Sequence, residues 1–201
     1  MLIDLVVYDG VDEMDVVGPL EVFRSAATAG AEVAARLVTQ VPQPIVKGAF
    51  GLGFEPDAVY QPGADVLLVP GGGWLARSDP GVWGEYRRGA WPALLHGAHE
   101  AGAGILAGVC TGTMLLAHAG VIGPRPATTH HGAWPDLEAT GVQLVRERVV
   151  DDGDLVTCGG VSSGIDLALW LLEREVSFAL AELVAERMEY SRVRPWKALR
   201  T

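Results

Sequence analysis

The sequence predicts an α/β fold in which a doubly wound, mostly parallel sheet is sandwiched by helices. Three observations predict it. Apolar, strand-like runs alternate with helix-like runs through most of the chain, as expected for strands joined by crossover helices. Several of these runs end in glycine-rich turns, and one ends at Cys110, between Gly108 and Gly112. A cysteine at such a tight strand-to-helix turn is typical of a nucleophile elbow.

The first half of the chain is expected to hold three strands of the central sheet. Apolar, β-branched runs between turn signals are typical of buried parallel strands, and they occur at residues 2–8, 33–39 and 65–69. The Gly-rich segment 45–54 is predicted to form a strand or hairpin at an edge. Helices are predicted at residues 17–27, with Pro19 in the first turn, and over most of 83–101, where Pro92 limits the continuous length.

The second half continues the alternation. Strands are predicted at residues 104–109 and 127–129, and helices at 113–119, 165–173 and 177–188. Residues 142–150 and 155–157 are expected to pair as a hairpin, because the connection between them contains an Asp-Gly turn signal. We interpret residues 1–190 as a single domain, followed by a basic tail, 191–201, that is expected to be only partly ordered.

Length and charge narrow the range of partners. With 201 residues the chain can build one sizeable core. A net charge of −10 and the lack of a basic run argue against nucleic acid, and no apolar stretch is long enough to span a membrane. The two cysteines, Cys110 and Cys158, are expected to be reduced, because the N-terminus enters a strand pattern with no signal peptide. The expected location is therefore the cytoplasm.

The predicted strand ends gather polar and glycine residues at one edge of the sheet. Asp15 follows the first strand, Gly71 to Gly73 follow the strand at 65–69, and Val161 and Ser162 lie at the last strand-to-helix junction. Since ligands of doubly wound sheets bind at the carboxyl ends of the strands, these residues should share a rim with Cys110. The helix after Cys110 is expected to favour the thiolate through its N-terminal dipole. The alternative is that Cys110 is a small buried apolar residue.

The chain resembles the ThiJ/PfpI superfamily, which has a flavodoxin-like sheet with a cysteine elbow. The markers are DEMDVVGPLEVF at 12–23, DVLLVPGGG at 65–73, GVCTGTMLLAHAG at 108–120, ATTHH at 127–131 and CGGVSSGIDLAL at 158–169. Together, in this order, they cover essentially the whole chain and are highly specific. They are most similar to the branch that contains isonitrile hydratase and the sensor domains of AraC-type regulators.

The resemblance implies a role for each residue that matches the family pattern. Cys110 would be the nucleophile and Asp15 its acidic partner, with the amides of Gly72 and Thr111 forming an anion hole. Thr111 would also orient groups at the elbow, Val161 would present its backbone to the cysteine, and the family position of His130 lies near the elbow. Peptidase-like members have a histidine where Thr111 stands, so their Cys-His dyad is not expected. His131 replaces a tryptophan that is usual in this branch, so the pocket wall should differ.

Simpler interpretations stand beside these roles. Asp15 could be a helix cap or a solvated turn residue, and His130 could be a hydrogen-bonded structural histidine. His96 and His99 have a spacing that suits a metal, but no carboxylate or cysteine converges on them, so no metal site is expected. Cys158 is interpreted as a packing residue at the end of a strand.

The leading functional hypothesis is an isonitrile hydratase-like lyase acting on a small molecule without a cofactor. The thiolate of Cys110 would attack the isonitrile carbon, and water guided by Asp15 would open the thioimidate to an N-substituted formamide. The alternatives are a glyoxalase or other small-molecule hydrolase of the same superfamily, or a non-enzymatic ligand or redox sensor that uses Cys110. The resemblance also implies a homodimer.

Overall fold

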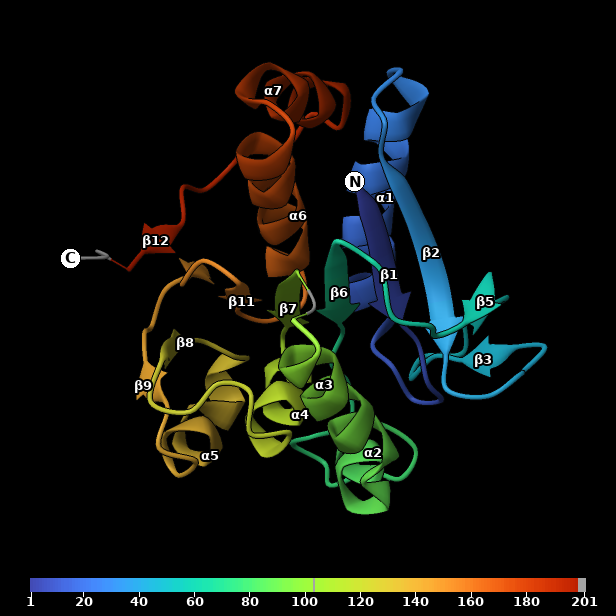
Figure 1. The fold of residues 1–201 in the computed structure, drawn as a ribbon, viewed down its shortest axis with the longest axis vertical. Coiled ribbons are helices and arrows are strands. Elements are labelled where there is room, and N and C mark those ends of the chain that lie inside the picture. Colours follow the sequence, from blue (N-terminus) through green and yellow to red (C-terminus); the bar gives the residue numbers. More distant parts are fainter. Residues whose placement is uncertain (103, 199–201) are drawn as a thin grey trace.

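The computed structural model describes residues 1–102 and 104–198, and within these ranges the main sheet has eight strands (Figure 1). They lie in the order β12-β10-β11-β7-β6-β1-β2-β5. Neighbours run parallel except β10 and β11, which are antiparallel. The bounds are β1 (Leu2–Val6), β2 (Ala34–Thr39), β5 (Ala58–Val59), β6 (Val66–Val69), β7 (Ile105–Val109), β10 (Val149–Asp151), β11 (Leu155–Cys158) and β12 (Trp196–Lys197). The chain adds β2 on one side of β1 and β6, β7 and β11 on the other, so the sheet is doubly wound as predicted.

Helices cover both faces of this sheet (Figure 1). On one face, α1 (Glu13–Thr28), α6 (Ser163–Glu175) and α7 (Phe178–Arg187) pack against one another. On the other, α2 (Val82–Arg88), α3 (Ala90–Glu100) and α4 (Gly112–His118) form a second cluster. The short helices η1 (His131–Ala133) and α5 (Trp134–Glu138) lie on the connection that leaves α4. The central strands β1, β6 and β7 are buried between the two helix layers, which explains why their sequences are apolar except for Asp4 in β1.

Two small sheets lie outside the main one. The predicted hairpin at 45–54 is present as β3 (Val46–Lys47) and β4 (Gly53–Phe54), which pair antiparallel with each other. The predicted strand at 127–129 is β8 (Pro126–Ala127), which pairs in parallel with β9 (Gln143–Leu144). The hairpin predicted from 142–150 is therefore partly wrong: β9 pairs with β8, and only β10 pairs with β11 across the Asp-Gly turn.

Other element boundaries also differ from the prediction. The helical stretch at 83–101 is broken at Gly89, whose φ of 74° ends α2 and precedes α3. Helix α1 begins at Glu13 rather than Val17, because Asp12 caps it by accepting from the amide of Met14 (3.1 Å). In the basic tail, Trp196–Lys197 pairs with β10 as an edge strand that was not predicted. Residues 199–201 of that tail lie outside the described ranges.

Glycines allow α1 and α6 to cross closely. A Cβ on Gly18 would lie 3.1 Å from Cγ1 of Ile165, and one on Gly164 would lie 3.0 Å from Cγ of Pro19 and 3.1 Å from Cγ1 of Val109. This contact matters for the site, because α1 carries Asp15 and α6 follows Val161 directly. In the described ranges, none of the helices is both long and apolar enough to cross a membrane.

Candidate active site

Cys110 lies between the end of β7 and the start of α4, with a φ of 55°. A side-chain-bearing residue rarely adopts this left-handed conformation, and such strain is concentrated at functional sites. The two flanking positions have no room for a side chain. A Cβ on Gly108 would lie 2.6 Å from Oγ1 of Thr113, and one on Gly112 would lie 2.0 Å from the carbonyl oxygen of Val69. The structure thus gives a physical reason for the G-x-C-x-G spacing seen in the sequence.

Backbone and side-chain hydrogen bonds hold the strained turn. The amide of Cys110 lies 3.2 Å from the carbonyl oxygen of Cys158 and 3.1 Å from that of Gly159, so it is anchored to the end of β11. The carbonyl oxygen of Cys110 accepts from Oγ1 of Thr129 (2.7 Å). The cysteine is therefore fixed by residues from two other segments of the chain.

Asp15 is fully buried in the first turn of α1. Its Oδ2 accepts from the amide of Gly71 (2.9 Å), whereas Oδ1 is buried and has no hydrogen-bond partner within the described chain. Burial raises the pKa of Asp15 to about 8, and the charge of Asp12 adds to this effect, while hydrogen bonds from Gly71 and Cys110 oppose it. The carboxyl is therefore mostly protonated at neutral pH, and its role as a simple cap is wrong because Asp12 caps the helix.

Cys110 is 5% exposed, and its thiol interacts directly with the Asp15 carboxyl. Burial raises the pKa of Cys110, and the charge of Asp15 raises it further, while backbone amides of Val161 and Thr111 oppose the shift. The expectation that the helix dipole would favour the thiolate is therefore wrong for the resting site. Desolvation outweighs the dipole of α4, which has only seven residues.

The predicted anion hole is arranged differently from the expectation. The amide of Gly72 donates to Oγ1 of Thr111 (3.0 Å), so the Thr111 side chain occupies that donor. The amide of Thr111 stabilises the sulfur of Cys110, together with the amide of Val161. Val161 has a φ of 48°, which turns its amide towards the elbow. The backbone donors near the sulfur are thus Thr111 and Val161, while the amide of Gly72 binds the Thr111 side chain.

His130 lies near Val161, at the edge of the site, and its ring has a structural role. Its Nδ1 accepts from the amide of Gly132 (3.1 Å) and caps η1. Burial lowers the pKa of His130, and the neighbouring His131 lowers it further. Both histidines line a cavity of about 430 Å³ that Val161 also borders; Cys110 is not among the residues that line it.

Two residues that support the site were missed by sequence reasoning. Thr129 binds the carbonyl of Cys110, and the ATTHH segment was the only signal that could have indicated it. Tyr8 donates its hydroxyl to the carbonyl oxygens of Pro70 and Gly71, and so holds the turn whose amide binds Asp15. Tyr8 ends an apolar run, so its sequence context predicted only burial.

Within residues 1–102 and 104–198, histidine, cysteine and acidic side chains form no group of three or more that could hold a metal ion. His96 contacts the carbonyl oxygen of Ala119 through Nδ1 (3.1 Å). Cys110 and Cys158 are both buried free cysteines, and Cys158 is fully enclosed, as a packing residue would be.

The chain is similar to known proteins over most of its length. The family model described as the DJ-1/PfpI family matches residues 2–174. The chain is 32% identical to an isonitrile hydratase from Pseudomonas putida over 199 residues, covering 96% of this chain and 80% of that protein. It is 35% identical over 92 residues to the HTH-type transcriptional regulator CdhR from Pseudomonas aeruginosa, covering 45% of this chain and 27% of that protein.

A solved structure gives the same result for the fold. The crystal structure of a ThiJ/PfpI family protein from Pseudomonas syringae superposes with a TM-score of 0.81 at 27% sequence identity, covering 97% of this chain and 77% of that one. The family match and the isonitrile hydratase match each extend over most of the sequence. The chain therefore belongs to the DJ-1/PfpI family.

Proposed function

We propose that this protein is a cysteine-dependent isonitrile hydratase, a lyase that adds water to an isonitrile and releases an N-substituted formamide. The main support for the proposal is that the Cys110 thiol and the Asp15 carboxyl form a buried pair. Burial raises the pKa of the Asp15 carboxyl to about 8. A carboxyl with a pKa near the working pH can both give and take a proton, as general acid-base catalysis requires. The similarity to an isonitrile hydratase adds support for this reaction over others.

In the first proposed step the isonitrile carbon gains both the sulfur of Cys110 and a hydrogen. The sulfur of Cys110 forms a bond to that carbon, and Asp15 transfers its proton to the same carbon. The proton of the thiol passes to the Asp15 carboxylate, which becomes a carboxylic acid again. The product is a thioimidate attached to Cys110, and the amides of Thr111 and Val161 stabilise negative charge on sulfur as the proton leaves.

In the second proposed step water hydrolyses the thioimidate. Asp15 donates its proton to the nitrogen and accepts one from the attacking water, whose oxygen bonds to the carbon. The carbon–sulfur bond then breaks while the hydroxyl group added from water loses its proton to the sulfur, which restores the thiol and releases the formamide. Both steps use one nucleophile and one proton carrier, so the reaction needs only the two side chains that the structure brings together.

An assay with cyclohexyl isocyanide tests the proposal. The wild-type protein should form N-cyclohexylformamide, detected by chromatography, and Cys110→Ala should lose roughly a thousandfold or more of this activity. Cys158→Ala is the matched control, because it removes the other buried thiol and should keep the activity.

Three results would contradict the proposal. Wild-type protein that forms no formamide excludes it directly, as does a Cys110→Ala variant that retains the activity. Consumption of methylglyoxal in the absence of isonitrile hydration would instead support the glyoxalase alternative. A peroxide-dependent mass increase at Cys110 without any turnover would support a redox sensor.

A further inference from the structure

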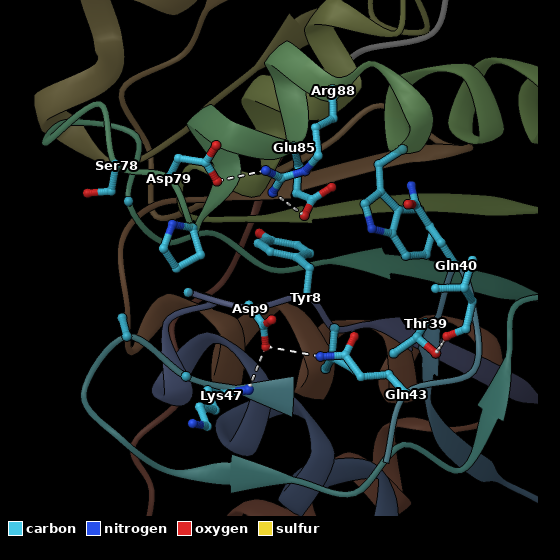
Figure 2. Close-up of a pocket in the computed structure, with 18 residues that line it drawn as sticks. Tyr8, Asp9, Thr39, Gln40, Gln43, Lys47, Ser78, Asp79, Glu85 and Arg88 are labelled. Atoms are coloured by element: carbon cyan, nitrogen blue, oxygen red, sulfur yellow. Dashed lines mark hydrogen bonds and ion pairs between the residues drawn. The ribbon is translucent and has the colours of Figure 1, made fainter. Parts of the chain in front are cut away.

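A second cavity, larger than the one beside His130, lies at the carboxyl ends of β1 and β2 (Figure 2). Its volume is about 700 Å³, within the range of small-molecule sites. Buried residues form its floor, among them Tyr8, Thr39 and Trp91, while exposed charged residues surround the opening. Cys110 is not among the residues that line it. Tyr8 and the glycine turn at 70–73 separate this cavity from the proposed active site.

Internal hydrogen bonds fix two opposite walls of the cavity. On one wall Arg88 binds both Asp79 and Glu85, at 2.7 Å each. On the other, Oδ1 of Asp9 accepts from the amide of Lys47 (2.9 Å) and from Nε2 of Gln43 (3.1 Å). Figure 2 shows the Arg88 and Glu85 wall facing the Asp9, Gln43 and Lys47 wall, with Tyr8 between them. The walls are therefore held in place before any ligand binds, which lowers the entropic cost of binding.

Two hydrogen-bond donors at this cavity lack a protein partner. Nε2 of Gln40 is buried and has none. Trp91 is 1% exposed, and its indole N–H makes no hydrogen bond to any residue in 1–102 or 104–198. A buried donor such as Nε2 of Gln40 is almost always satisfied, so an acceptor group in the cavity would complete it. The indole N–H of Trp91 is not enclosed in this way and offers a second donor to the same acceptor. A carboxylate supplies two acceptor oxygens for this purpose.

The charges around the cavity select against a simple anion. The lining contains three carboxylates, of Asp9, Asp79 and Glu85, and two cations, of Lys47 and Arg88. Arg88 is already shared by two of these carboxylates. Within the described chain, the second carboxylate oxygens of Asp9 and Glu85 accept no hydrogen bond. The excess negative charge and these open acceptors favour a ligand that also carries an ammonium group.

We propose that this cavity binds a small zwitterion of the size of a free α-amino acid. The ligand's carboxylate would accept from Gln40 and Trp91, and its ammonium group would donate to one of the open oxygens, of Asp9 or of Glu85. The rings of Tyr8 and Trp91 would contact its side chain. A phosphate ester does not fit this arrangement, because the excess of carboxylates would repel it.

Thermal-shift screening of the common L-amino acids, followed by titration calorimetry on the strongest, tests the proposal in the full-length protein. At least one should bind saturably at millimolar concentration or below, while its N-acetyl and amide derivatives, which each lack one of the two charges, should bind at least tenfold more weakly. Gln40→Leu should weaken binding by tenfold or more, as should Trp91→Phe, which keeps an aromatic ring but removes the N–H. Gln61→Leu, at an exposed position outside the cavity, is the matched control and should bind like wild type.

Several outcomes would overturn the proposal. One is that no free amino acid binds, so that water alone satisfies the donors. A second is that the blocked derivatives bind as well as the parent amino acid. A third is that Gln40→Leu folds normally by circular dichroism and still binds with wild-type affinity. Cys110→Ala should bind normally; loss of binding there would place the ligand at the thiol instead. Because this variant is inactive under the proposed function, the two proposals can fail separately.

Discussion

At the scale of single residues, the proposed activity depends on how burial changes Asp15 and Cys110. Each group lies in a position where its ionised form is poorly solvated, and each would repel the other if both were charged. The pair is therefore neutral at rest, and proton transfer between its members needs no large movement. Oδ1 of Asp15, which receives no donor, is the oxygen that can hold the transferable proton.

The rate of isonitrile hydration should fall as the pH rises through about 8. The acid form of Asp15 is required for the first step, and its pKa is about 8, so kcat/KM should be flat below this pH and decrease tenfold per unit above it. Asp15→Asn should lose 10²- to 10⁴-fold of the activity at neutral pH, the usual range for general acid-base groups. A pH profile of wild type that is flat to pH 10 would contradict this role.

Asp15 should also make the protein less stable at higher pH. Its pKa is near 4 in an unfolded chain and about 8 in the folded protein, so between these values the folded state holds a proton that the unfolded state has lost. The Asp15 contribution to the free energy of unfolding therefore falls from pH 4 to pH 8. Urea unfolding of Asp15→Asn should show up to about 4 kcal/mol more stability, relative to wild type, at pH 8 than at pH 5. An equal difference at both pH values would mean that Asp15 is ionised in the folded protein.

At the scale of elements, the close crossing of α1 and α6 fixes the distance between the acid and the elbow. Gly164→Ala places a Cβ 3.0 Å from Cγ of Pro19 and 3.1 Å from Cγ1 of Val109, which is tighter than ordinary contact. It should cost roughly 1 kcal/mol in the free energy of unfolding and reduce the hydratase activity. Gly97→Ala is the control, because a Cβ there has no neighbour within 4 Å in the middle of α3. It should stabilise the protein by roughly 0.5–1 kcal/mol and leave the activity unchanged. Similar effects at both positions would show that the crossing does not constrain the site.

Elements with a strong local signal were predictable, and those that depend on distant partners were not. The strands at 2–8, 65–69 and 104–109 match β1, β6 and β7 closely, because each is an apolar run between turn signals. Strands β5 and β12 have two residues each, and only pairing with β2 and β10 makes them strands. The segment 142–150 has one continuous strand-like pattern in the sequence, but its two ends join different sheets. The division depends on which distant strands lie beside each end.

At the scale of the whole molecule, the topology explains why the site residues could be predicted while their ionisation could not. Parallel strands bring Asp15, Thr111 and Val161 to Cys110 at one edge of the sheet. The pKa of each group depends on the depth of burial, which no sequence spacing reports. The same edge holds the second cavity, on the other side of the turn at 70–73, and its floor residues Gln40 and Trp91 carry no motif.

The most direct test of the central claim is a titration of the Asp15 carboxyl in the folded protein. Carbon-13 NMR of protein labelled at aspartate carboxyl carbons, with Asp15→Asn used to assign the resonance, reports its protonation at each pH. A midpoint near 8 is predicted, and it should move in Cys110→Ala because that variant removes the thiol that contacts the carboxyl. A midpoint near 4, as in an unfolded chain, would contradict the proposed proton transfer between Asp15 and Cys110.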